Sequence, residues 1–257
     1  MPDVQPPRDQ DPRPLLVGHR GAAALEPENT VRAVRRGIAE GADLVEFDVH
    51  LSADGQDVIL HDPELDRTAA PASPLRHGRV DGYTRTELDT VLLEHGERLP
   101  RLAQMLDAAH RPDGAAVPAL VEVKAPAAAS LVVAALRERF PREAFADPGT
   151  SPAWVISFHP AALAAARAEA PEVPRMLIAH AADDAFFAVA EELEVAQLSL
   201  RIRDCRPEDA ARCREGGRRL NLWTARTEEQ LDRALDLGCD TLTVDDPAWA
   251  RRRLAGA

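Results

Sequence analysis

The chain has 257 residues, a formal net charge of −12 and an isoelectric point near 5.1. That length suits one domain with a core large enough to fold without disulfide bonds. The negative charge, in the absence of a long lysine or arginine cluster, argues against a broad nucleic-acid surface. An anionic small molecule would therefore need local positive charge, such as a bound metal ion.

Residues 1–13 are polar and proline-rich, and we expect them to form a flexible segment ahead of a single domain at residues 14–257. They contain no apolar signal-peptide core, and no later stretch approaches the roughly 18 apolar residues of a membrane helix. The three cysteines match neither a zinc motif nor a disulfide framework. We therefore predict a cytoplasmic protein without stable membrane insertion; the sequence favours no particular oligomeric state.

Short apolar, β-rich runs recur along the chain with helical segments between them. The eight candidate strands are Leu15–Gly18, Leu44–Val49, Leu120–Val123, Trp154–Ser157, Arg175–Ile178, Gln197–Leu200, Leu220–Trp223 and Thr241–Val244. Amphipathic patterns such as Glu28–Ala39 predict helices between them. Because strand and helix alternate eight times, the sequence predicts an α/β fold, a (β/α)8 barrel of the TIM type.

A ninth strand candidate, Asp57–Leu60, follows the turn residues Ala53 to Gly55 too closely for a helical crossover. We interpret it as the return arm of a hairpin from the second barrel strand. From there to about Leu99 the sequence shows turns and one short helix from Thr86. We therefore predict a small insertion after the second strand, at about residues 50–99, which would shape the substrate pocket at the barrel mouth.

Two acidic residues, Glu46 and Asp48, lie two positions apart in LVEFDV, so both side chains project from one face of a strand. Glu122 and Lys124 repeat this spacing in LVEVK. Because unpaired buried acids are costly, three inward carboxylates predict a divalent-cation site, and their oxygens suit Mg²⁺ or Ca²⁺. The alternative is a set of buried ion pairs, Glu122 with Lys124 or Glu46 with an arginine.

Two histidines end predicted strands near the same mouth. His19 closes the first strand in LLVGHRG, where barrel enzymes place catalytic groups, and His61 closes the hairpin arm in VILHD. A single histidine is more often structural, but two imidazoles beside a carboxylate site would form an acid–base pair suited to neutral pH. His50 lies two residues after Asp48 and is a candidate supporting residue. The other five histidines are predicted to lie on the surface or to support the fold.

Read together, these segments closely resemble the glycerophosphodiester phosphodiesterase family. The order begins with GHRG, continues with PENT at Pro27–Thr30, and then with VEFDVHLSADGQDVILHD at Val45–Asp62. The likeness extends through LDRT at Leu65–Thr68, LVEVK at Leu120–Lys124, ISFHP at Ile156–Pro160, LNLWT at Leu220–Thr224 and VDDP at Val244–Pro247. It therefore covers nearly the whole chain from about Leu15.

The resemblance implies a (β/α)8 barrel that uses a divalent metal ion to hydrolyse small-molecule glycerophosphodiesters to glycerol 3-phosphate and an alcohol. It implies that the metal ligands are Glu46, Asp48 and Glu122, that the catalytic pair is His19 and His61, and that the substrate-binding residues are Arg20, Lys124 and Trp223. Trp223 could equally be core packing. Ala225 and Arg226 after LNLWT, and Val244 before Asp245, depart from the family pattern, so the preferred head group stays open.

Two other functions are compatible with the same residues. A lysophospholipase D-type enzyme would cleave a lipid diester with the same groups, and a non-catalytic barrel would bind a phosphate ligand without cleaving it. Within the hydrolytic interpretation, the sequence also leaves open which histidine is the acid and which is the base. Attack by water and attack by a glycerol hydroxyl, through a cyclic phosphate, are both compatible with it.

Overall fold

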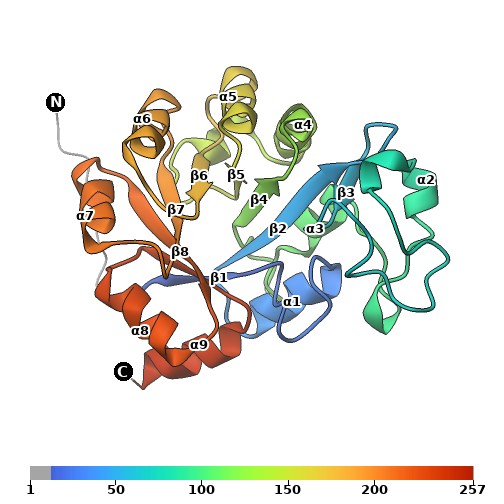
Figure 1. Cartoon of the computed structure of the whole chain (residues 1–257), viewed down its shortest axis with the longest axis horizontal. Coiled ribbons are helices and arrows are strands. Elements are labelled where there is room, and N and C mark those ends of the chain that lie inside the picture. The colour runs from blue at the N-terminus through green and yellow to red at the C-terminus, as the bar shows by residue number, and fades with distance from the viewer. Residues whose placement is uncertain (1–12, 257) are drawn as a thin grey trace.

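In the computed structural model, which describes residues 13–256, parallel strands form a closed barrel surrounded by helices (Figure 1). The barrel strands are β1 (Leu15–Gly18), β2 (Leu44–Leu51), β4 (Ala119–Val123), β5 (Ala153–Ser157), β6 (Arg175–Ala179), β7 (Gln197–Arg201), β8 (Arg219–Ala225) and β9 (Thr241–Val244). Each pairs with its neighbours in the order β1-β9-β8-β7-β6-β5-β4-β2, and β1 also pairs with β2, which closes the barrel. The predicted fold class is confirmed, with strand ends shifted by two residues at most. Apart from Arg13, the segment predicted to be flexible lies outside the described residues.

The predicted hairpin arm is also confirmed. Strand β3 (Asp57–Ile59) pairs antiparallel with β2, with Val49 opposite Ile59. The insertion that follows lies to the right of the barrel in Figure 1 and includes α2 (Arg85–Leu88). It has a small apolar core of its own, made by Val58, Leu60, Leu65, Val80, Leu88, Val91, Leu93 and Leu99. The insertion is thus a packed unit attached to the second barrel strand.

The helices outside the barrel are α1 (Val31–Ala39), α3 (Leu102–Ala108), α4 (Ala129–Arg139), α5 (Pro160–Glu169), α6 (Asp184–Glu192), α7 (Pro207–Glu215), α8 (Glu228–Asp236) and α9 (Pro247–Ala255). The predicted start of α1 at Glu28 is three residues too early. Thr30 caps this helix, because its Oγ1 accepts a hydrogen bond from Ala33 N at 3.0 Å, and Asn29 has a φ of 58°. Likewise, α2 begins at Arg85 rather than at Thr86, after a capping box made by Thr84 and Glu87.

Side chains fill the barrel interior, which has an apolar half and a polar half. The apolar half contains Val17, Leu44, Leu120, Trp154, Ile156, Met176 and Ile178. In the polar half, Gln197 Nε2 donates to Thr241 Oγ1 at 2.7 Å, and Asn221 Nδ2 donates to Ser199 Oγ at 2.7 Å. Because the interior is packed, functional groups have room only at the carboxyl ends of the strands.

Within residues 13–256, no helix is long and apolar enough to cross a membrane. The cytoplasmic location stays a prediction.

Candidate active site

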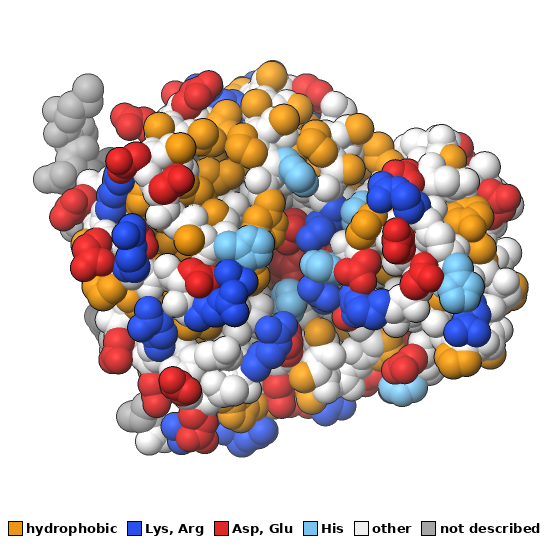
Figure 2. Space-filling view, viewed as in Figure 1, with side chains coloured by type: hydrophobic (Ala, Val, Ile, Leu, Met, Phe, Trp, Pro, Cys, Tyr) orange, Lys and Arg blue, Asp and Glu red, His pale blue; other side chains and the backbone are white. Residues whose placement is uncertain are grey.

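Three carboxylates from two neighbouring strands meet at the barrel mouth. Asp48 on β2 is in register with Glu122 on β4, and Glu46 lies two residues earlier on β2. One oxygen from each lies within 4.8 Å of the others, and all three residues are buried. Figure 2 shows acidic side chains in a hollow near the centre of this face, with basic and histidine side chains around it. We call these three residues the acidic triad.

The crowding within the acidic triad shifts its proton affinities. Burial, together with the charges of Asp48 and Glu122, raises the pKa of Glu46 well above its ordinary value. Burial and the charge of Asp48 raise the pKa of Glu122 to about 7. Burial also acts to raise the pKa of Asp48, but the nearby cations, Lys124 foremost, outweigh it, and this pKa lies below its ordinary value. Part of the triad therefore carries protons near neutral pH, which a divalent cation would displace.

Two basic residues lie against the triad. Lys124 Nζ is 2.7 Å from Glu122 Oε1 and 3.4 Å from Asp48 Oδ1. Arg20 donates its backbone N–H to Glu46 Oε2 at 2.9 Å, and its Nε is 3.6 Å from Asp48 Oδ2. Burial lowers the pKa of Lys124, but the charges of Asp48 and Glu122 outweigh this and raise it overall. Of the ion pairs that were the alternative to a metal site, Glu122 with Lys124 is present, whereas the guanidinium of Arg20 pairs with Asp48 and Glu28 rather than with Glu46.

The acidic triad nevertheless fits a divalent cation. Asp48 Oδ2 accepts a hydrogen bond from Asn29 Nδ2 at 2.8 Å, whereas Asp48 Oδ1 is buried and accepts no hydrogen bond from any residue within 13–256. A buried carboxylate oxygen that accepts no hydrogen bond, with Lys124 Nζ 3.4 Å away and two other carboxylates close by, is suited to a cation. The ligand atoms are all hard oxygens, as Mg²⁺ and Ca²⁺ prefer.

The loop after β1 is held close to the triad by backbone contacts. Gly21 has a φ of 88°, and its N–H donates to Glu46 O at 3.0 Å. A Cβ atom at Gly21 would lie 2.4 Å from the backbone carbon of Ala33, so only glycine fits. Farther along, Asn29 also accepts from Asp48 N at 3.1 Å through its Oδ1. The segments GHRG and PENT thus support Glu46 and Asp48 from one side.

His19 follows β1 and meets the carboxyl end of β9. Its Nδ1 is 2.5 Å from Asp245 Oδ1, and its backbone N–H donates to Val244 O at 2.9 Å. Burial raises the pKa of Asp245, but its hydrogen bonds with His19 and Arg226 outweigh this and hold it below the ordinary value. An ionised Asp245 favours a proton on Nδ1 of His19 and leaves Nε2 for chemistry.

His61 has a matching arrangement at the end of the hairpin arm. Its Nδ1 is 2.7 Å from Asp62 Oδ1, and His50 Nε2 is 3.0 Å from the backbone oxygen of His61. Burial lowers the pKa of His61, which favours the neutral ring that a general base requires. His50 thus supports His61 through the backbone.

Trp223 belongs to an aromatic wall at the same end of the barrel. Its ring centroid is 5.6 Å from that of Phe158 and 5.5 Å from that of His180. Trp223 is partly buried against the apolar interior, and its Nε1 has no hydrogen-bond partner among the described residues. The ring therefore packs on the core at the barrel mouth, and its role in lining the substrate side stays a prediction.

Several residues of the site were not identified as functional from the sequence. They are Asn29, Asp62, Phe158, His180 and Asp245, and each lies within or beside a motif of the resemblance or at the end of a strand. His180 in particular is predicted only to lie on the surface or to support the fold, yet it forms part of the aromatic wall. A search for acids next to His61 and next to the last strand would have found Asp62 and Asp245.

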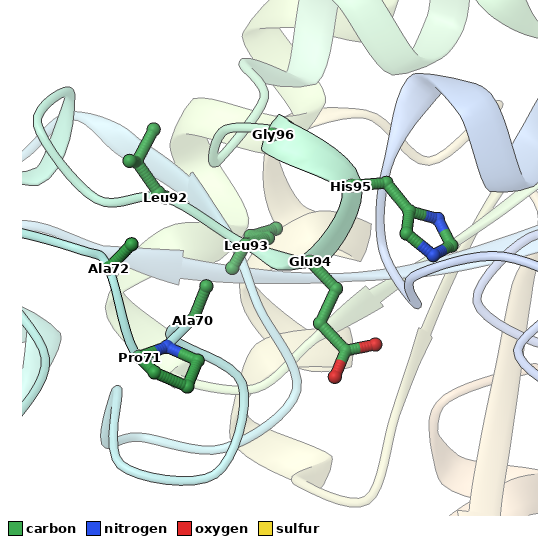
Figure 3. A pocket seen from close by; sticks show the side chains of 8 residues that line it. All are labelled: Ala70, Pro71, Ala72, Leu92, Leu93, Glu94, His95 and Gly96. Atoms are coloured by element: carbon green, nitrogen blue, oxygen red, sulfur yellow. The ribbon is translucent and has the colours of Figure 1, made fainter.

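A groove of about 460 Å³ lies on the insertion rather than at the triad (Figure 3). It is lined by Ala70, Pro71, Ala72, Leu92, Leu93, Glu94, His95 and Gly96. None of the predicted site residues lines it. The predicted role of the insertion in shaping the substrate pocket therefore stays a prediction.

The fold and the acidic triad define a (β/α)8 barrel protein with a candidate divalent-cation site at its mouth, flanked by two carboxylate-bound histidines. Residues 19–249 match the model of the glycerophosphoryl diester phosphodiesterase family. Because this match covers most of the chain, the protein belongs to that family.

Individual relatives agree with this assignment. The chain is 38% identical over 186 residues to a Mycobacterium tuberculosis protein named "Probable glycerophosphodiester phosphodiesterase 1", and the match spans 64% of each chain. It is 25% identical over 240 residues to a glycerophosphodiester phosphodiesterase of Caldanaerobacter subterraneus subsp. tengcongensis, covering 91% of this chain and 94% of that one. The structure of an Oleispira antarctica phosphodiesterase superposes with a TM-score of 0.82 at 23% identity, over 95% of this chain and 97% of that chain. At that identity the likeness establishes the fold.

The raised pKa of Glu122 predicts how stability depends on pH in metal-free protein. Its folded-state pKa is about 7 and its ordinary value is 4.5, so between these pH values the folded protein binds more protons than the unfolded chain. The free energy of unfolding should therefore fall as pH rises through this window. Glu122→Gln should gain stability relative to the wild-type protein between pH 5 and pH 8, measured by urea denaturation in chelator.

Glu138→Gln, an exposed glutamate on α4, is the matched control and should show no such gain. If the free energies of unfolding of the wild-type protein and of Glu122→Gln differ by the same amount at pH 5 and at pH 8, the prediction is wrong.

Proposed function

We propose that this protein is a metal-dependent glycerophosphodiester phosphodiesterase that releases glycerol 3-phosphate and an alcohol. The observation that carries the proposal is the meeting, at one barrel mouth, of the acidic triad with two histidines that are each bonded to a carboxylate. Family membership supports the choice of substrate class. The Oleispira antarctica phosphodiesterase, whose structure contains the product sn-glycerol-3-phosphate, also supports it.

In this proposal Glu46, Asp48 and Glu122 hold a Mg²⁺ or Ca²⁺ ion. When bound, such an ion supplies positive charge to the non-bridging phosphate oxygens, where negative charge grows during the reaction. Lys124 and Arg20 lie within ion-pair distance of the triad, so both can bind and orient the same phosphate. These local cations allow an acidic chain to bind an anionic substrate.

His19 and His61 are the proposed proton-transfer pair. Each bonds a carboxylate through Nδ1, so Nε2 is the atom that exchanges protons with the reacting oxygens. One histidine accepts the proton of the nucleophile, and the other donates a proton to the leaving alkoxide. His61, whose pKa is lowered by burial, suits the base, which leaves His19 as the acid. Trp223 would line the side of the mouth that receives the substrate.

Removal of the metal tests the first part of the proposal. Treatment with EDTA should abolish hydrolysis of a glycerophosphodiester, and added Mg²⁺ or Ca²⁺ should restore it, because Lys124 and Arg20 alone do not neutralise the charge that develops. The measurement is release of glycerol 3-phosphate in a coupled assay. Full activity in chelator would exclude a metal role.

Histidine substitution tests the second part. His19→Ala and His61→Ala should each lower kcat by at least the ~10²-fold typical of a lost acid or base. His77→Ala provides a matched control, since His77 is an exposed insertion histidine that also bonds a carboxylate, Asp66, at 2.7 Å. The control should keep wild-type kcat. A His19 or His61 variant with near-normal turnover and an intact fold would remove that residue from the mechanism.

A substrate panel separates the proposal from its alternatives. Glycerophosphocholine, glycerophosphoethanolamine, glycerophosphoglycerol and a lysophospholipid would be assayed with each metal. Preference for the soluble diesters supports the proposal, whereas preference for the lysophospholipid identifies a lysophospholipase D-type enzyme. Absence of hydrolysis of every diester with metal present would identify a non-catalytic barrel.

A further inference from the structure

Each proposed catalytic histidine is bonded to an aspartate, and this aspartate is bonded in turn to an arginine. Asp62 Oδ1 is 2.7 Å from His61 Nδ1, and Asp62 Oδ2 accepts a hydrogen bond from Arg67 Nε at 2.5 Å. Asp245 likewise bonds His19 through Oδ1, at 2.5 Å, and Arg226 Nε through Oδ2. In both chains, the carboxylate uses one oxygen for the histidine and the other for the arginine.

This arrangement restricts the rotation of the carboxylate. A carboxylate bonded through one oxygen turns about its terminal torsion, whereas one bonded through both oxygens has a fixed plane. The plane of the carboxylate sets the orientation of the ring whose Nδ1–H it accepts, and so sets where Nε2 points. The rigid, always charged guanidinium is suited to this role.

The two arginines come from opposite sides of the mouth. Arg67 lies in the insertion, in the LDRT segment, and Arg226 follows β8 at a position where the chain departs from the family pattern. Arg67 also donates to Glu28 through Nη1 at 2.8 Å and through Nη2 at 2.6 Å. Glu28 in turn accepts from Arg20 Nη1 at 2.8 Å. Arg67 therefore links the insertion both to His61 and to a proposed phosphate-binding residue.

We propose that Arg67 and Arg226 are positioning residues that orient His61 and His19 through Asp62 and Asp245. This inference rests on the proposed function, because the orientation of the two rings affects turnover only if both histidines transfer protons. Both arginine side chains are about half exposed, 47% and 56%. Exposed ion pairs add little to stability. Replacing either arginine should therefore change the stability of the protein little, and a loss of kcat would then report on the positioning of the histidine.

The test uses Arg67→Gln and Arg226→Gln, which remove the charged fork and keep a polar side chain. Each should lower kcat about 10- to 100-fold, by analogy with the loss of the outer hydrogen-bond partners of metal-bound histidines. The melting temperature should stay near that of the wild-type protein. The matched controls Arg36→Gln and Arg253→Gln remove arginines of similar exposure, 47% and 42%, that pair with Glu40 and Glu228 rather than with a carboxylate bonded to a histidine. These controls should keep wild-type kcat.

Double variants show whether each arginine acts through its carboxylate. In an Asp62→Ala background, Arg67→Gln should cause no further loss of kcat beyond about twofold, and Arg226→Gln should behave in the same way in Asp245→Ala. Equal losses with and without the carboxylate would overturn the proposal. So would single variants with the kcat of the controls.

Nitrogen-15 spectra of the histidine rings provide a readout without substrate. In the wild-type protein both rings should carry their proton on Nδ1. Arg67→Gln should shift the signals of His61 toward a mixture of tautomers and leave those of His19 unchanged, and Arg226→Gln should do the reverse. Unchanged spectra in both variants would overturn the proposal. Failure of the proposed function is distinguishable, because it would appear as an inactive wild-type protein whose spectra still respond to the arginines.

Discussion

Three carboxylates are held within 4.8 Å of one another in the buried mouth of the barrel, and much of the surrounding structure compensates for their mutual repulsion. Proximity and burial raise the pKa of Glu46 and of Glu122, so the triad is electrostatically unfavourable when it is fully ionised. Lys124 and Arg20 offset part of this charge. A divalent cation would offset the rest, and Asp48 Oδ1, which accepts no hydrogen bond from the described residues, would be available as a ligand. Buried acids that repel one another do not stabilise the fold, and such an arrangement is typical of a functional site.

A second set of residues holds the reactive groups in place. Asn29 bonds both the backbone and the side chain of Asp48, and His50 bonds the backbone oxygen of His61. The two histidines are each bonded to a carboxylate that is bonded in turn to an arginine. The insertion takes part directly through Arg67, even though its apolar groove lies apart from the triad. The barrel strands thus supply the acidic triad, while the loops and the insertion supply the carboxylates and arginines bonded to the histidines.

Local patterns predicted much of the fold and the centre of the site. The strands were predictable because each is a short apolar run, and the triad was predictable because residues two apart on a strand share a face. The start of α1 was missed because a side-chain cap at Thr30 and the backbone turn at Asn29 override the apolar periodicity. The partner of His19 lies 226 residues away, so the sequence could mark Asp245 as an acid after the last strand but could not pair it with His19. The aromatic wall was missed for the same reason, because Phe158, His180 and Trp223 follow or end different strands and meet only when the barrel closes.

We propose that the acidic triad binds a divalent cation and that the histidines do not. Isothermal titration calorimetry of chelator-treated protein with Mg²⁺ and with Ca²⁺ tests it most directly. We expect one bound ion per chain in the wild-type protein, in His19→Ala and in His61→Ala, and loss of binding in Asp48→Asn. Wild-type affinity in Asp48→Asn, or loss of binding in the histidine variants alone, would contradict it.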